Sequence, residues 1–170
     1  MNSQEKFDSK FYYQAVIKYS ELALHYRCSS YDILKKIATS GNPNINSDTF
    51  DRLLSFYVRD VYDSDYLGID SSISSVTLLI DLTKNTNINL TNDFFVDLIK
   101  TTSKLHSEQL LETSQFEVFL GIASNSNPNI EVSTLKSLAD KVKNKNEARQ
   151  IELTVKKKYP RTPASFTRRM

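Results

Sequence analysis

Side chains that could carry out catalysis or bind a metal ion are few in this sequence and lie far apart. The two histidines, His25 and His106, have no cysteine at ligand spacing, and the single cysteine, Cys28, has no partner for a disulfide. A zinc site needs several nitrogen or sulfur ligands at characteristic spacing. The sequence also has no phosphate-binding glycine loop, no HExxH motif and no nucleophile elbow. We therefore expect no enzyme activity, no catalytic residue, no metal site and no cofactor.

One acidic segment has part of the spacing of a calcium-binding loop. Asp63, Asp65 and Gly68 stand at positions 1, 3 and 6 of such a loop. Position 5 is Leu67, and position 12 is Ser74 where a bidentate glutamate belongs. Because two ligand positions fail, we interpret the segment as an acidic, solvated loop, with docking of a basic partner as the alternative.

The clearest cluster with a chemical role lies near the end of the sequence. Residues 141–170 carry ten Lys and Arg against two Glu, whereas residues 1–140 carry 12 Lys and Arg against 18 Asp and Glu. Clustered cations bind phosphates by releasing counterions, and they also dock on acidic protein surfaces. Binding of nucleic acid, binding of a protein and contact with the chain's own acidic body all stay open, and a membrane is disfavoured. The candidate residues are Lys156, Lys157, Lys158, Arg161, Arg168 and Arg169.

The elements that must position these residues are predicted by an internal repeat. Segments 29–54 and 114–139 align without a gap, with nine of 26 positions identical. A weaker copy at 74–99 lies between them, and its turn, at 85–88, reads as shortened. The copies are 45 and then 40 residues apart, which is in the range of two-helix solenoid repeats.

Each copy has the pattern of a helix, a turn and a second helix. Ser29 and Ser114 open sequences of capping-box form, and an apolar helical face follows each of them. The prolines of the turns end the first helix, and Ser47 or Ser133 suits the N-cap of the second. The asparagines favour turn conformations, and the isoleucines suit the space between the helices. We assign a structural role to these turn residues, which are Asn42, Pro43, Asn44, Ile45, Asn127, Pro128, Asn129 and Ile130.

Helical periodicity extends over the rest of the chain, and no strand is expected. The predicted helices cover 9–27, 30–39, 47–62, 74–84, 91–104, 107–112, 115–125, 133–143 and 146–159. Pro160 and Pro163 bar further helix, so we expect a flexible basic tail over 160–170.

The stretch from Ile122 to Ile130, with Leu135 and Leu138 after it, resembles the variant leucine-rich repeat. Those repeats read approximately Leu-Ala-x-Asn-Pro-Asn-x-Pro followed by a leucine-rich helix, and the family is similar to HEAT-like solenoids. The second turn proline is absent here, and the family's units are much shorter than 40–45 residues. Ile37 to Leu54 matches about as well. The resemblance implies an α-solenoid that displays a binding surface, and it implies no activity.

The sequence thus predicts an all-α protein, built as a short right-handed α-solenoid of about three helix–turn–helix repeats. The single domain covers 1–159, with repeats near 29–62, 74–104 and 114–143, an N-terminal helix and a basic C-terminal helix and tail. We expect a non-catalytic interaction module or adaptor that binds a protein through the solenoid face, which is built mainly from the second helix of each repeat. The alternative is a nucleic-acid-associated protein anchored by its basic C-terminal segment. No apolar run is long enough to span a membrane and the first residues lack a signal-peptide pattern, so we expect a cytoplasmic location.

Overall fold

The computed structural model describes residues 7–25, 27–66, 72–111 and 115–160. Within these residues the protein is all-α, with eight α-helices, one short 3₁₀ helix and no strand. The helices are α1 (Ser9–His25), α2 (Arg27–Ala38), α3 (Ser47–Tyr66), α4 (Ser72–Lys84), α5 (Asn92–Ser107), α6 (Gln115–Ser124), α7 (Val132–Lys136) and α8 (Lys145–Lys158), with the 3₁₀ helix η1 (Ala139–Lys141) before α8.

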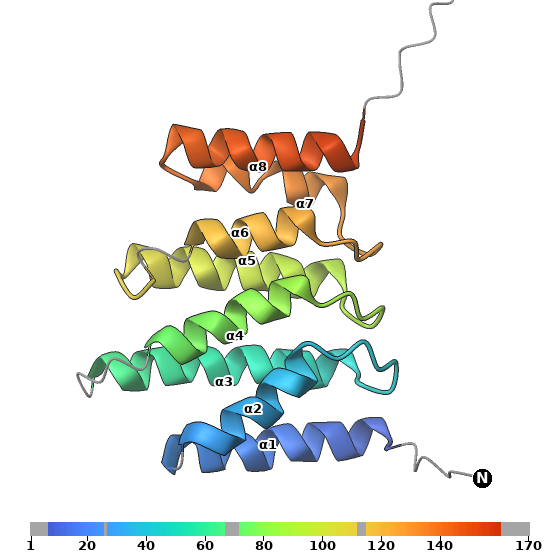
Figure 1. Cartoon of the computed structure of the whole chain (residues 1–170), viewed down its shortest axis with the longest axis vertical. Coiled ribbons are helices and arrows are strands. Elements are labelled where there is room, and N and C mark those ends of the chain that lie inside the picture. Colours follow the sequence, from blue (N-terminus) through green and yellow to red (C-terminus); the bar gives the residue numbers. More distant parts are fainter. Residues whose placement is uncertain (1–6, 26, 67–71, 112–114, 161–170) are drawn as a thin grey trace, which may run out of the picture.

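The helices lie in two rows that run side by side from α1 at one end to α8 at the other (Figure 1). In one row, α4 contacts α2 and α6, and α6 contacts α8. In the other row, α3 contacts α1 and α5, and α5 contacts α7. Three turns join the rows along the same edge of the molecule, between α2 and α3, α4 and α5, and α6 and α7 (Figure 1).

One continuous apolar core fills the space between the rows. Its large, fully buried side chains come from both rows, and they include Leu34, Phe50, Leu79, Phe95 and Phe119. Burying a side chain of this size contributes roughly 1.5–3 kcal/mol. The core therefore holds the two rows together along the whole stack.

Glycine is used at the closest approach between two helices of one row. A Cβ atom at Gly121 of α6 would lie 2.0 Å from Oγ1 and 2.9 Å from Cβ of Thr83 on α4. Thr83 is fully buried, and its hydroxyl donates to the carbonyl of Ile80 at 2.6 Å. The side chain cannot move aside easily, so only glycine permits this approach of α6 to α4.

Several predicted boundaries differ from the structure. Helix α2 begins at Arg27, so Ser29 lies inside it and does not cap it. The N-cap of α3 is provided by Asn46, whose Oδ1 accepts from the N–H of Thr49 at 3.2 Å, and not by Ser47. Helix α7 begins at Val132, so Ser133 is not its N-cap either.

Residues 107–111, the described part of the helix predicted over 107–112, do not form a separate helix. Helix α5 continues to Ser107, and the chain then turns at Gln109, which has a positive φ of 64°. The predicted helix over 133–143 is reduced to five residues of α7 and the three of η1. Helix α3 extends four residues beyond its predicted end, to Tyr66.

Candidate functional site

The three turns on the shared edge are built from asparagines that repeat at every second position. In each turn an asparagine Oδ1 accepts from the backbone N–H two residues later, as Asn42 does from Asn44 at 2.9 Å. The same bond joins Asn85 to Asn87, Asn87 to Asn89, Asn125 to Asn127, and Asn127 to Asn129, at 2.7–2.9 Å. These are Asx turns, which explains why asparagine occupies these positions.

In the second and third turns, the Nδ2 group of each of these asparagines donates to backbone carbonyls of the preceding turn. The Nδ2 of Asn87 donates to the carbonyls of Asn42 at 2.8 Å and Ser40 at 3.3 Å. One turn further, Nδ2 of Asn127 donates to the carbonyl of Asn87 at 2.8 Å. The remaining bonds of this kind run from Asn85 to Ala38 and Ser40, from Asn89 to Pro43 and Ile45, from Asn125 to Thr83 and Asn85, and from Asn129 to Ile88 and Leu90. The three turns therefore form an asparagine ladder, in which each turn is a rung bonded to the rung before it.

The ladder corrects the interpretation of the middle turn. Its hydrogen bonds pair Asn87 with Asn42 and with Asn127, so the middle turn runs on through Asn89 to Leu90 and is not shortened. Leu90 is buried, as are the isoleucines at the same place in the other two turns, Ile45 and Ile130. The sequence comparison missed this because Ile88 stands where the other two turns have proline.

Both ends of the ladder are closed by side chains or backbone of the end helices. On the first rung, Nδ2 of Asn42 donates to the hydroxyl of Tyr12 at 2.8 Å, and Nδ2 of Asn44 to the carbonyl of Phe7 at 3.1 Å. On the last rung, Nζ of Lys158 donates to the carbonyl of Asn125. Because the amide NH₂ groups of the ladder donate within the chain, they hold helices in place and are not free to bind a ligand.

The predicted basic segment is only partly available to a partner in the described residues. Lys156 pairs with Glu152 on the same helix at 3.2 Å, and Lys158 is occupied by the last rung and by a cation–π contact with Tyr159. Lys157 is exposed. The other three predicted residues, Arg161, Arg168 and Arg169, lie outside the described part of the chain.

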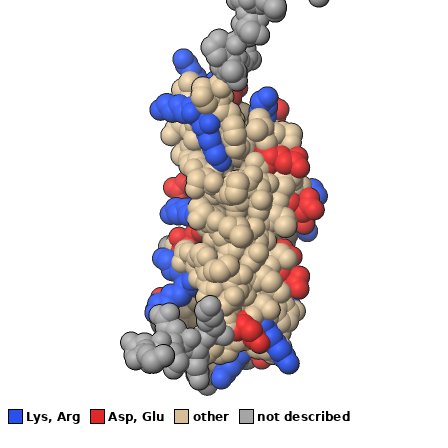
Figure 2. All heavy atoms as spheres, turned by 90° about the vertical axis from the view of Figure 1, so that its right-hand side faces the viewer, with Lys and Arg blue, Asp and Glu red and all other residues tan. Residues whose placement is uncertain are grey.

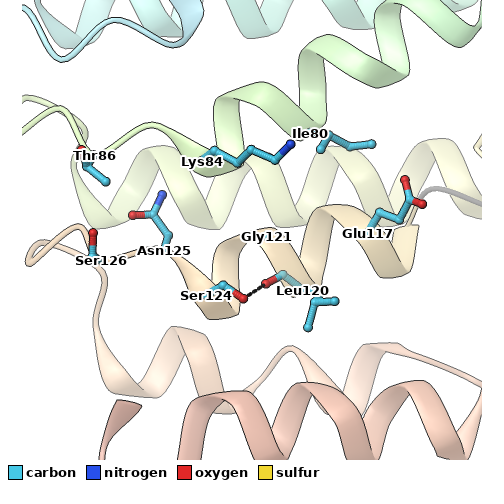
Figure 3. Close-up of a pocket in the computed structure, with 9 residues that line it drawn as sticks. All are labelled: Ile80, Lys84, Thr86, Glu117, Leu120, Gly121, Ser124, Asn125 and Ser126. Carbon is cyan, nitrogen blue, oxygen red and sulfur yellow. Dashed lines mark hydrogen bonds between the residues drawn. The ribbon is translucent and has the colours of Figure 1, made fainter. Parts of the chain in front are cut away.

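A groove of about 570 Å³ lies between α4 and α6, beside the ladder (Figure 3). Its floor is formed by the half-buried Ile80, Leu120 and Gly121. Lys84 on α4 and Glu117 on α6 place opposite charges on its walls. Four polar residues close the end next to the turns, and they are Thr86, Ser124, Asn125 and Ser126 (Figure 3). An apolar floor with polar groups at one end and charges on the walls suits a short peptide segment.

Two further hollows lie toward the α8 end of the molecule. One, of about 470 Å³, is lined by α7, η1 and α8 and includes the exposed Val132 and Tyr159. The other, of about 570 Å³, includes His106 and the lysines Lys141 and Lys143. A ring nitrogen of His106 lies 3.2 Å from the carbonyl of Leu111, so this histidine has a partner in the segment that follows α5.

The remaining residues singled out from the sequence form no metal site in the described part of the chain. There, no group of three or more His, Cys, Asp and Glu side chains is placed to hold a metal ion. Asp63 lies on α3, 3.3 Å from the guanidinium of Arg59. Gly68 and the side chains of His25, Cys28 and Asp65 lie outside the described residues. Among the helices described, none is long and apolar enough to cross a membrane.

Charges are segregated on the two sides of the ladder edge. Figure 2 views this edge directly, and it shows an uncharged strip with mostly basic side chains along one side and mostly acidic ones along the other. The basic side follows C-terminal ends of helices in the row of α2, α4, α6 and α8, with Lys36 on α2, Lys84 on α4 and Lys158 on α8. The acidic side follows the starts of the second helices, with Asp48 on α3 and Asp93 on α5. This placement complements the helix dipoles, which favour cations at C-termini and anions at N-termini.

Partial burial and neighbouring aspartates raise the pKa of one aspartate on the acidic side of the ladder edge. The pKa of Asp51 is raised above its ordinary value, first by partial burial and then by the charges of Asp48 and Asp97. In the sequence, lysines precede the first two turns and aspartates follow them, but only the contacts of the ladder bring these charges to one edge.

Comparison with known proteins does not extend this description, because no family model, curated protein or solved structure matches the chain. The resemblance to variant leucine-rich repeats accordingly stays a prediction from the turn sequences.

Proposed function

We propose that this protein is a non-catalytic interaction module, built as a short right-handed α-solenoid, that binds a segment of a protein partner in the groove between α4 and α6. The observation that carries the proposal is this groove, with its apolar floor of Ile80, Leu120 and Gly121. Exposed apolar side chains in a concave surface mark binding sites more often than isolated ones do.

The asparagine ladder supports the solenoid part of the proposal. Its hydrogen bonds relate the three turns at spacings of 45 and 40 residues, as in the sequence alignment. A solenoid in which each unit contacts only its neighbours presents an extended surface of fixed shape. A groove between two bonded units is then preorganised, which lowers the entropic cost of binding.

The groove lies between first helices, whereas the sequence led us to expect the face of the second helices. The exposed positions of α3 and α5 carry mainly charged side chains, among them Asp51, Arg52, Asp97 and Lys100. Lys100 and Asp97 pair with each other at 3.2 Å. Exposed pairs of this kind contribute little to binding energy, so the groove between α4 and α6 is the better candidate.

Selection from a random peptide library on the full chain would test the proposal. We expect selected peptides to lose binding by about tenfold or more when Leu120→Asp places a charge on the groove floor. The matched control is Leu153→Asp, at an apolar position that is 50 % exposed on α8. Peptides that bind both variants equally well, or a library that yields none, would contradict the proposal.

The alternative function, anchoring to nucleic acid through the basic segment, has less support. Of the run of three lysines, Lys156 and Lys158 have partners within the chain, and Lys157 alone is left exposed and unpaired among the described residues. Phosphate contacts give an affinity that falls steeply with salt concentration. Binding of an RNA or DNA oligonucleotide that collapses between about 50 and 200 mM salt would favour this alternative.

A further inference from the structure

The ladder edge has a surface that is complementary to itself. Its centre is uncharged and carries the exposed tips of the three turns, Pro43, Ile88 and Pro128. Ile88, in the middle rung, is 67 % exposed, the largest exposed fraction among the exposed large apolar side chains of the described residues. A large apolar side chain held by a rigid turn at the centre of a surface has the character of an interface anchor.

Each rung carries a cation on one side of this centre and an anion on the other. The first rung has Lys36 before the turn and Asp48 after it, and the second has Lys84 and Asp93.

The third rung completes the series with charges from different helices. Helix α6 has no base in its last turn, but Lys158 of α8 reaches the carbonyl of Asn125 and supplies a cation at the same place. The anion is Glu131, the exposed N-cap residue of α7. The third rung therefore also has a cation at the start of the turn and an anion after it.

We propose that this edge binds a second copy of the chain, in a symmetric dimer whose twofold axis runs along the stack. A rotation about that axis places the basic side of one copy against the acidic side of the other and keeps the rungs at equal height. Lys36 and Lys84 of one copy then face Asp48 and Asp93 of the other, and Lys158, which stays bound to its own Asn125 carbonyl, adds positive charge opposite Glu131 of the other copy. A twofold axis across the stack would instead oppose like charges, which disfavours that arrangement.

The arrangement also explains the uncharged centre. Residues near the twofold axis of a symmetric interface meet their own equivalents, so Ile88 packs against Ile88 of the second copy. Any charge there would be opposed by an identical charge. Apolar and small side chains are the types that tolerate this position, and these are the types at the three turn tips.

Sedimentation of the full chain over a concentration range up to about 100 μM tests the dimer directly. We expect a monomer–dimer equilibrium that weakens as salt is added, because part of the attraction is between exposed charges. Ile88→Lys places two like charges at the axis and should weaken the dimer by at least about tenfold. Leu153→Lys, on the exposed face of α8, is the matched control and should leave it unchanged.

A charge exchange on the first rung gives the sharpest result. In a dimer of Lys36→Glu chains, the introduced acid faces Asp48 of the other copy. In a dimer of Asp48→Lys chains, the introduced base faces Lys36 of the other copy. Each variant alone should therefore be monomeric. Mixed together they restore both attractive contacts, and a heterodimer should form. Neither residue lines the groove between α4 and α6, so this result is independent of peptide binding.

Thermal melts of each variant, monitored by circular dichroism, show that the fold is retained. A wild-type chain that sediments as a monomer throughout the range would overturn the proposal. A dimer that is indifferent to Ile88→Lys, or a mixture of the two charge variants that stays monomeric, would equally overturn it.

Discussion

Removing one central asparagine of the ladder should unfold the protein at a markedly lower temperature. Asn87 is 1 % exposed, and its side chain makes three hydrogen bonds. In Asn87→Ala, the N–H of Asn89 loses its acceptor, and an unsatisfied buried donor costs about 1–3 kcal/mol. The carbonyls of Ser40 and Asn42 each keep another donor, so each lost bond there costs only about 0.5–1.5 kcal/mol.

These losses add to about 4 kcal/mol, which corresponds to a decrease in Tm of roughly 8–16 °C for a chain of this size. Thermal and urea unfolding followed by circular dichroism measure both quantities. Asn146→Ala, at an exposed asparagine of α8, is the matched control and should change the free energy of unfolding by no more than about 0.5 kcal/mol.

Asn87→Asp separates the two halves of the amide group. One oxygen of the introduced carboxyl still accepts from the N–H of Asn89. The second oxygen faces the carbonyls of Ser40 and Asn42, and it can donate a hydrogen bond there only when the carboxyl is protonated. The pKa of the introduced group is therefore higher in the folded than in the unfolded state. The variant then loses stability as the pH rises from about 4 to 7, relative to wild type. A loss below about 1 kcal/mol for Asn87→Ala, or a pH-independent Asn87→Asp, would refute the reasoning.

Three further predictions follow from particular contacts. Gly121→Ala forces a Cβ against Thr83 and should lower the free energy of unfolding, measured in urea, by about 1–3 kcal/mol. Thr83→Ala should partly restore the stability of Gly121→Ala, and a double variant whose effects are simply additive would contradict a clash between the two side chains. The pKa of Tyr57 is raised, first by burial and then by Tyr31 and Asp81, and its hydroxyl has no hydrogen-bond partner. Tyr57→Phe should therefore lower the free energy of unfolding by less than about 0.5 kcal/mol at neutral pH. It should also reduce the loss of stability above about pH 10, because the folded state favours the neutral phenol of Tyr57. Equal alkaline melting of both proteins would contradict this. Lys158→Ala should speed amide hydrogen exchange at the end of α8, whereas Lys157→Ala should not, and identical exchange in both variants would exclude a role for Lys158 in closing the ladder.

The sequence alone predicted the helical class and most of the helices, because apolar side chains recur at helical spacing on both sides of each turn. The first and third turns were also located correctly, since proline and asparagine end helices by local chemistry, whereas the middle turn, which has no proline, was interpreted as too short. Local rules of this kind need no knowledge of distant contacts.

What could not be predicted depended on contacts between turns. The donors of Asn87 reach carbonyls 45 and 47 residues earlier in the chain, and no local pattern encodes this. The groove likewise depends on how closely α6 approaches α4 at Gly121, which a single glycine in a helix does not reveal. The contact of Lys158 with a carbonyl 33 residues away is likewise not encoded in the local pattern of the basic segment.

The ladder is the central claim of this account, and exchange of its side-chain amide protons tests it most directly. In a ¹⁵N-resolved NMR spectrum of the full chain, the NH₂ protons of Asn85, Asn87, Asn125 and Asn127 should be strongly protected against exchange with D₂O, because these side chains are buried and donate to backbone carbonyls. The NH₂ of the exposed Asn146 should exchange at the rate of a free amide. Free exchange of all five would contradict the ladder and the stacked arrangement of turns that rests on it.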